Sequence, residues 1–135
     1  MRINKRKILK GFRIAVLFVY ILFVLWATIF SRAKGSHGKI MLIPMSAWGV
    51  TQEYHRHFIA NLFMLLPVGF LLPGISTKLN SWKKTVALCA LFALCLETAQ
   101  LITGTGDFQI DDLWSNTFSA LVGYWLRRLL IKGVK

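Results

Sequence analysis

Four long apolar stretches alternate with short polar segments along this 135-residue chain. They run over residues 14–30, 57–75, 85–102 and 112–131. Each approaches the roughly 20 residues that an α-helix needs to cross the hydrocarbon core of a bilayer. The pattern predicts an all-α polytopic membrane protein, with four transmembrane helices in a compact bundle and residues 1–135 as a single domain.

The composition agrees with a membrane protein. Apolar residues make up 56% of the chain, above the ~45–50% of ordinary soluble domains. The first stretch follows a basic segment, as the core of a signal peptide does. It is rich in bulky aromatic residues, however, and no small-x-small cleavage site follows it. We therefore expect this stretch to be retained as the first span.

The distribution of charge predicts the orientation. Most of the 17 Lys and Arg residues lie in the N-terminal segment, the second loop and the C-terminal segment. Because Lys and Arg stay on the cytoplasmic side, we expect both termini in the cytoplasm of a multi-pass protein of the cell membrane. The net charge of +12 comes from residues that flank apolar stretches. That placement favours membrane lipids as partners and argues against nucleic acid.

Polar side chains inside the predicted spans mark a candidate site. Glu97 and Gln100 are i, i+3 neighbours, and Asp112 and Asn116 are i, i+4 neighbours, so each pair shares a helix face. A short loop makes the two helices antiparallel and brings both faces to the extracytoplasmic end. A carboxylate within a span costs roughly 2.5–3.5 kcal/mol, which favours a function for Glu97. The predicted polar pocket comprises Asn61, Glu97, Gln100, Asp111, Asp112 and Asn116.

Structural roles for these residues remain open. The acids and amides would also serve as hydrogen-bonded links between helices, and Asp111 or Asp112 would serve as an N-cap of the fourth helix. Arg127 and Arg128 are interpreted as snorkelling anchors. Two stripes at helical spacing predict the packing faces. They are Cys89, Ala93, Glu97 and Gln100 on the third span, and Asp112, Asn116, Ser119 and Gly123 on the fourth.

The chain between the first two spans carries fewer signals. The short apolar segment 40–45 is too broken to span and is expected at the membrane interface, and Pro67 predicts a kink in the second span. Glu53, His55 and His57 alternate, a spacing that shares a face on a strand but not on the helix expected here. We therefore expect no metal site. No nucleotide or phosphate fingerprint is present, and no cofactor is expected.

Several short motifs between residues 40 and 124 occur in a fixed order. They are Leu42-Ile43-Pro44, Asn61-Leu62-Phe63, Leu66-Pro67-Val68-Gly69-Phe70-Leu71-Leu72, Glu97-x-x-Gln100, Phe108-x-Ile110-Asp111-Asp112-Leu113, Asn116-Thr117 and Gly123-Tyr124. In this combination the chain resembles the VanZ-like family of small bacterial membrane proteins. The resemblance implies a connection with resistance to teicoplanin, a glycopeptide antibiotic.

The chain departs from the family pattern at two positions. The family usually has an arginine shortly before the Phe-x-Ile-Asp-Asp segment, where this chain has Thr105 and Gly106. It usually has a glycine where Ser119 stands. The missing arginine predicts that the acids of the site lack their counter-ion.

Three functions are compatible with these features. The first is a membrane protein that lowers sensitivity to teicoplanin-type antibiotics, its polar pocket engaging a lipid-linked cell-wall precursor or the antibiotic itself. The second is a membrane-embedded enzyme on a lipid-linked substrate, with Glu97 and Asp112 as general acid and base. No nucleophile accompanies them, so the sequence leaves catalysis open. The third is an accessory subunit of a larger membrane complex.

Overall fold

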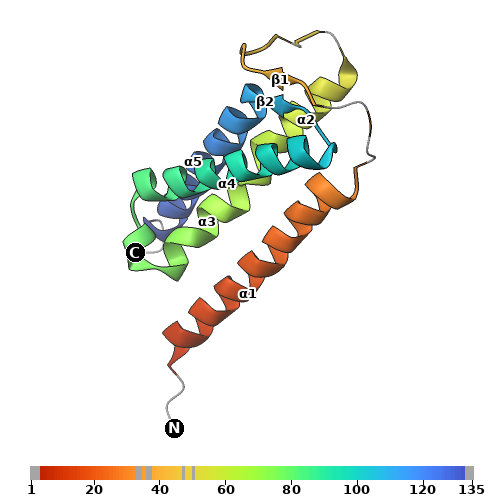
Figure 1. Ribbon diagram of the computed structural model, residues 1–135. Coiled ribbons are helices and arrows are strands. Elements are labelled where there is room, and N and C mark those ends of the chain that lie inside the picture. Colours follow the sequence, from red (N-terminus) through yellow and green to blue (C-terminus); the bar gives the residue numbers. More distant parts are fainter. Residues whose placement is uncertain (1–3, 33–34, 36–37, 47, 50, 133–135) are drawn as a thin grey trace.

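The computed structural model describes residues 4–32, 35, 38–46, 48–49 and 51–132. These residues are mostly helical, with one two-stranded sheet at one end of the bundle (Figure 1). The helices are α1 (Lys5–Leu25), which continues into a π-helical turn (Trp26–Phe30), α2 (Gln52–Met64), α3 (Leu66–Ile75), α4 (Trp82–Thr103) and α5 (Ile110–Lys132). A 3-10 turn (Thr77–Leu79) connects α3 to α4, and the strands are β1 (Ile40–Met41) and β2 (Phe108–Gln109).

Three helical segments of the described chain are long and apolar enough to cross a membrane. They are Lys5–Phe30, Gln52–Ile75 and Trp82–Thr103. The fourth predicted span, α5, differs because charged residues lie near both of its ends. The uncharged stretch 113–126 is only about 21 Å long by helical rise, shorter than the ~30 Å hydrocarbon core. The fourth span and the orientation of the termini stay predictions.

All four predicted spans begin earlier in the structure, and the difference is largest for α1 and α2. Helix α1 starts at Lys5, where the side chain of Asn4 accepts a hydrogen bond from the Arg6 backbone N–H at 3.2 Å. Helix α2 starts at Gln52, where Thr51 caps it by accepting from the Tyr54 backbone N–H at 3.2 Å. Predictions from apolar runs missed these polar first turns because capping and helix propensity, rather than hydropathy, decide where a helix begins.

The predicted kink in the second span is confirmed. The helix breaks at Leu65, and α3 begins with Pro67 in its first turn, where the missing N–H costs little. The hydroxyl of Tyr20 on α1 donates to the Met64 carbonyl next to the break, at 2.8 Å. A neighbouring helix thus satisfies part of the backbone at the kink, as a membrane interior requires.

Helix α5 lies at the centre of the bundle and packs against α2, α3 and α4. Its contact with α3 is a direct approach of two backbones. A Cβ at Gly69 would meet the Ala120 carbonyl, and a Cβ at Gly123 would meet the Leu66 carbonyl. Small residues permit such contacts between helices in lipid. All eight residues of the two predicted packing stripes are buried, which confirms those faces.

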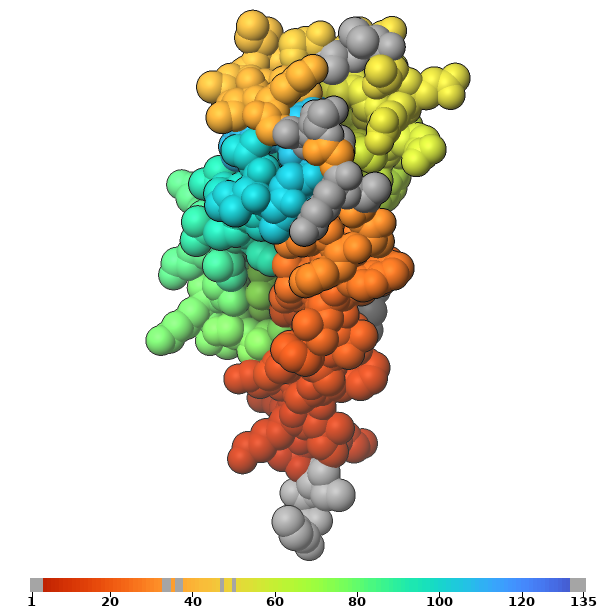
Figure 2. All heavy atoms as spheres, turned by 45° about the vertical axis from the view of Figure 1, so that its right-hand side comes forward, coloured from red at the N-terminus to blue at the C-terminus, as the bar shows by residue number. Residues whose placement is uncertain are grey.

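Helix α1 packs along α3 and lies at the edge of the bundle (Figure 1). Its first turns project beyond the other helices (Figure 2). Most of its large apolar side chains are exposed, Phe12, Phe18 and Val19 among them. This exposure is typical of a helix that faces lipid.

A short parallel sheet joins two loops whose pairing we did not predict from the sequence. Ile40 pairs with Phe108, and Met41 pairs with Gln109. The Asp107 carboxylate strengthens the junction by accepting from the backbone N–H groups of Gly38 and Lys39 at 2.9 and 3.0 Å. Two-residue strands have no periodicity to detect, so this pairing was missed. We call this end of the bundle the strand end, and the opposite end, where α3 and α5 finish, the arginine end.

Candidate functional site

Two carboxylates from different helices lie close together at the strand end. Glu97, on the next-to-last turn of α4, is 2% exposed, and Asp112, on the first turn of α5, is 4% exposed. They are near enough to interact electrostatically. Glu97 also accepts a hydrogen bond from the backbone N–H of Gln109 at 3.2 Å, which ties β2 to α4. The α4–α5 hairpin thus brings together Glu97 and Asp112, two of the four residues that the sequence predicted to converge there.

A cation that interacts with both carboxylates comes from Arg32. This residue follows the π-helical turn at the end of α1 and interacts electrostatically with both Glu97 and Asp112. A Cβ at Gly106 would lie 3.4 Å from Arg32 Nη1, so the guanidinium occupies the space beside that glycine. The expectation that the acids lack a counter-ion is therefore wrong. Hydropathy gave no signal for Arg32, which looks like an ordinary flanking base after an apolar stretch.

The two amides nearest the carboxylates have distinct roles. The Asn61 side chain on α2, 5% exposed, hydrogen-bonds to the Asp112 carboxylate. Gln100 donates from Nε2 to the Thr28 carbonyl at 3.4 Å, which links α4 to the end of α1. Its Oε1 would lie 3.3 Å from a Cβ at Gly106, so it shares that space with Arg32. Asn61 therefore belongs to the carboxylate cluster, and Gln100 borders it.

Asp111 faces a different partner set from Asp112. Its carboxylate accepts from the Tyr54 hydroxyl at 2.6 Å, the Met45 backbone N–H at 2.9 Å and the Trp114 indole N–H at 3.0 Å. Because α5 begins at Ile110, both acids lie inside its first turn rather than at the N-cap position. Asp111 instead fastens the loop around Met45 and the start of α2 onto α5.

Asn116 lies one turn deeper on α5 and Ser119 lies two turns deeper. Both are 0% exposed. Neither the Asn116 amide nor the Ser119 hydroxyl has a hydrogen-bond partner among the residues that the structure describes. Asn116 therefore sits beneath the carboxylate cluster rather than in direct interaction with it.

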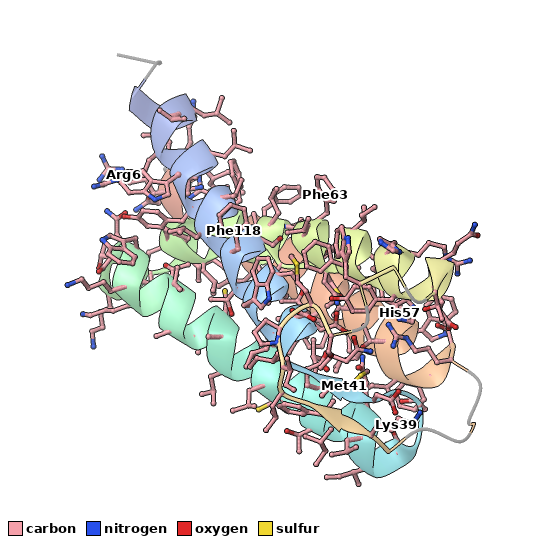
Figure 3. All side chains as sticks on the ribbon, turned by 90° about the horizontal axis from the view of Figure 1, so that it is seen from above. Arg6, Lys39, Met41, His57, Phe63 and Phe118 are labelled. Carbon is pink, nitrogen blue, oxygen red and sulfur yellow. The ribbon has the colours of Figure 1, made fainter. Side chains whose placement is uncertain are left out.

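A cavity of about 530 Å³ opens at the strand end next to this cluster. Figure 3 shows three of its lining residues, Lys39 and Met41 from the β1 segment and His57 from α2. Of the six predicted site residues, Asp112 lines it. The full lining is Arg32, Lys39, Met41, Thr51, Glu53, Tyr54, Arg56, His57, Thr105, Gly106, Asp107, Gln109 and Asp112. Charged side chains of both signs therefore surround the opening.

The histidines of this region do not form a metal site with their neighbours. Glu53, His55 and His57 lie on α2, where alternate residues point in different directions. His57 Nε2 lies 4.0 Å from Glu53 Oε1 one helical turn away, while His55 Nδ1 lies 3.0 Å from the Thr51 carbonyl. Within the described residues, no group of three His, Cys, Asp or Glu side chains is placed to hold a metal ion.

Comparison with known proteins gives one finding. A family model described as VanZ/LLP1 matches residues 14–131. The match confirms the resemblance and extends it to the first span and Arg32. No curated protein and no solved structure matches the chain.

Proposed function

The chain belongs to the VanZ/LLP1 family, and from this premise we propose that it lowers bacterial sensitivity to teicoplanin-type glycopeptides. Membership connects the chain, at the level of the family, with membrane proteins linked to glycopeptide resistance. The observation that carries the proposal is the cluster of the buried Glu97, Asp112 and Asn61 with the partly exposed Arg32, beside a cavity of about 530 Å³. Intramembrane charges held in fixed geometry are characteristic of functional sites.

The proposed topology has four spans, with both termini in the cytoplasm and the strand end outside. The distribution of basic residues supports this orientation, because Lys78, Lys83, Lys84, Arg127 and Arg128 all lie at the arginine end. Helix α5 would complete the bundle as its central span. Neighbouring helices cover its acidic first turn, which lowers the cost of placing Asp111 and Asp112 near the membrane.

The proposed ligand is the head of a lipid-linked wall precursor or of the antibiotic. A volume of about 530 Å³ falls within the roughly 300–1,000 Å³ of small-molecule sites. Lys39 and Arg56 supply cations for phosphate or carboxylate groups, and Glu53 supplies an anion for amines. Such a lining suits a ligand that carries charges of both signs.

Expression in a teicoplanin-sensitive bacterium tests the proposal. We expect a several-fold rise in the inhibitory concentration of teicoplanin and a smaller change for vancomycin. Glu97→Ala should abolish the rise, because it removes one carboxylate of the cluster. The matched control is Thr98→Val, since Thr98 is exposed on the same helical turn and bonds only within α4 in the described contacts. An unchanged teicoplanin response, or full activity of Glu97→Ala at equal membrane abundance, refutes the proposal.

A second candidate function is catalysis on a lipid-linked substrate. It is favoured by one observation, the electrostatic contact between the buried Glu97 and Asp112 carboxylates. Two carboxylates in unequal environments suit general acid–base chemistry. Purified protein in nanodiscs with labelled wall precursor separates the candidates, because an enzyme yields a changed product and Glu97→Gln should stop its formation. Binding without product leaves the first candidate.

A further inference from the structure

Two arginines from distant parts of the chain converge on the last turns of α3. Arg13 on α1 donates from Nη1 to the Gly74 carbonyl at 2.9 Å. Arg127 on α5 donates from Nη1 to the Phe70 carbonyl at 3.5 Å, and a Cβ at Gly74 would lie 2.6 Å from its Nη2. From the sequence we interpreted Arg127 as a snorkelling anchor. In the structure its guanidinium lies against the last turns of α3.

Arg13 and Arg127 also repel each other, because they are near enough for their charges to interact. The carboxyl-terminal turn of a helix favours cations, which explains part of this arrangement. A guanidinium has five N–H donors, however, and the bond described for each arginine uses one nitrogen. The pair therefore keeps donor capacity and a positive field at the end of α3.

A small pocket lies on the α5 side of this pair. Its volume is about 170 Å³. Arg128 forms part of its wall and lies over the Tyr124 ring at 5.8 Å from the centroid. The pocket, here named the Arg127 pocket, is lined by Pro73, Asn80, Tyr124, Arg127, Arg128 and Ile131.

The chain supplies no acidic side chain to this end. Its five acids lie in the first turns of α2 and α5, near the end of α4 and in the loop before β2. Those positions all belong to the strand end. The two arginines of the pocket are therefore matched by backbone carbonyls and aromatic rings rather than by carboxylates. An anion from outside the described residues would complete the charge balance.

We propose that the Arg127 pocket binds the phosphate of an anionic phospholipid headgroup. Arginine forks match phosphate oxygens, and the Asn80 amide adds a neutral donor. The pocket adjoins the end of the candidate span Gln52–Ile75, the level at which headgroups lie. Leu129, Leu130 and Ile131 are 67%, 55% and 55% exposed beside it, so acyl chains have an apolar surface to contact. This surface favours a lipid phosphate over free phosphate.

Native mass spectrometry of the full chain in detergent tests the proposal, with added phosphatidylglycerol or phosphatidylcholine as probes. We expect one phosphatidylglycerol to remain bound preferentially. Arg128→Gln should weaken its retention about tenfold, because a hydrogen bond to a charged group is lost. Asn80→Ala should also weaken retention without changing the net charge. Lys83→Gln is the matched control, since it removes one charge at the same end but outside the pocket.

Three results would overturn the proposal. Equal retention of both lipids would show that the headgroup charge is not recognised. An equal loss in Lys83→Gln and Arg128→Gln would indicate a diffuse attraction rather than a site. Displacement of phosphatidylglycerol by millimolar inorganic phosphate would identify free phosphate as the ligand. The teicoplanin response of Arg128→Gln should match that of the unsubstituted protein, so this proposal and the strand-end function fail independently.

Discussion

The arginines at the two ends of the bundle have different kinds of partner. At the strand end, Arg32 interacts with Glu97 and Asp112, so cation and anions come from the same chain. At the arginine end, Arg13 and Arg127 meet backbone carbonyls of α3. Charges matched within the chain give a fixed constellation, whereas cations without matching carboxylates depend on the surroundings. One end of this small bundle therefore holds charges that the chain itself pairs, and the other holds arginines whose described contacts are backbone carbonyls and aromatic rings.

The α3–α5 contact connects the two ends, so breaking it should have the largest effect. Gly123→Leu places a side chain against the Leu66 backbone and should separate the helices, at about 3 kcal/mol or more. Both the teicoplanin response and phosphatidylglycerol retention should be lost together. Thermal denaturation in detergent, followed by size-exclusion chromatography, measures the loss.

Gly11→Leu is the control for this substitution. A Cβ at Gly11 meets nothing within 4 Å, and that glycine also lies in a helix. Its melting temperature should be equal or slightly raised, because glycine disfavours helix interiors. A stable Gly123→Leu variant with both functions intact would contradict the central role of the contact.

Arg32→Gln should disrupt the carboxylate cluster at the strand end and leave the arginine end intact. It leaves Glu97 and Asp112 buried together without their cation, which should cost about 2–3 kcal/mol of unfolding free energy. The double variant Arg32→Gln/Glu97→Gln should recover part of that loss, because fewer like charges remain. A double-mutant cycle on melting temperatures measures the coupling. Strict additivity of the two changes would mean that Arg32 and Glu97 do not interact.

The equivalent change at the arginine end should be milder. Arg127→Gln loses a 3.5 Å bond to the Phe70 carbonyl but also relieves repulsion from Arg13. We expect a cost of about 1 kcal/mol or less in the same denaturation assay. A loss as large as that of Arg32→Gln would remove the distinction between the two ends.

Asn116→Leu should have the smallest effect on stability and a larger one on function. The amide is 0% exposed and without a hydrogen-bond partner in the described part of the chain. A leucine of similar volume should keep or raise the unfolding free energy, by about 1 kcal/mol at most. If the amide serves the proposed site, the teicoplanin response falls while the protein stays folded. A drop in melting temperature would instead assign Asn116 a structural bond.

The sequence predicted most of what depends on helical periodicity. The stripes through Glu97 and Asp112 are buried as expected, and Pro67 lies where the second span breaks. Periodicity contains no information about contacts between loops, so the pairing of Ile40 with Phe108 was missed. Arg32 was missed for the same reason. Its partners are more than sixty residues away along the chain, and the turn that directs it toward them follows from tertiary packing.

Gly106 has a steric consequence for the charges at the strand end. It leaves room for a guanidinium that arrives from the end of α1, beside carboxylates held by α4 and α5. A side chain larger than alanine at position 106 would therefore occupy the space of this guanidinium and push the cation away from both carboxylates, without changing any charge in the chain.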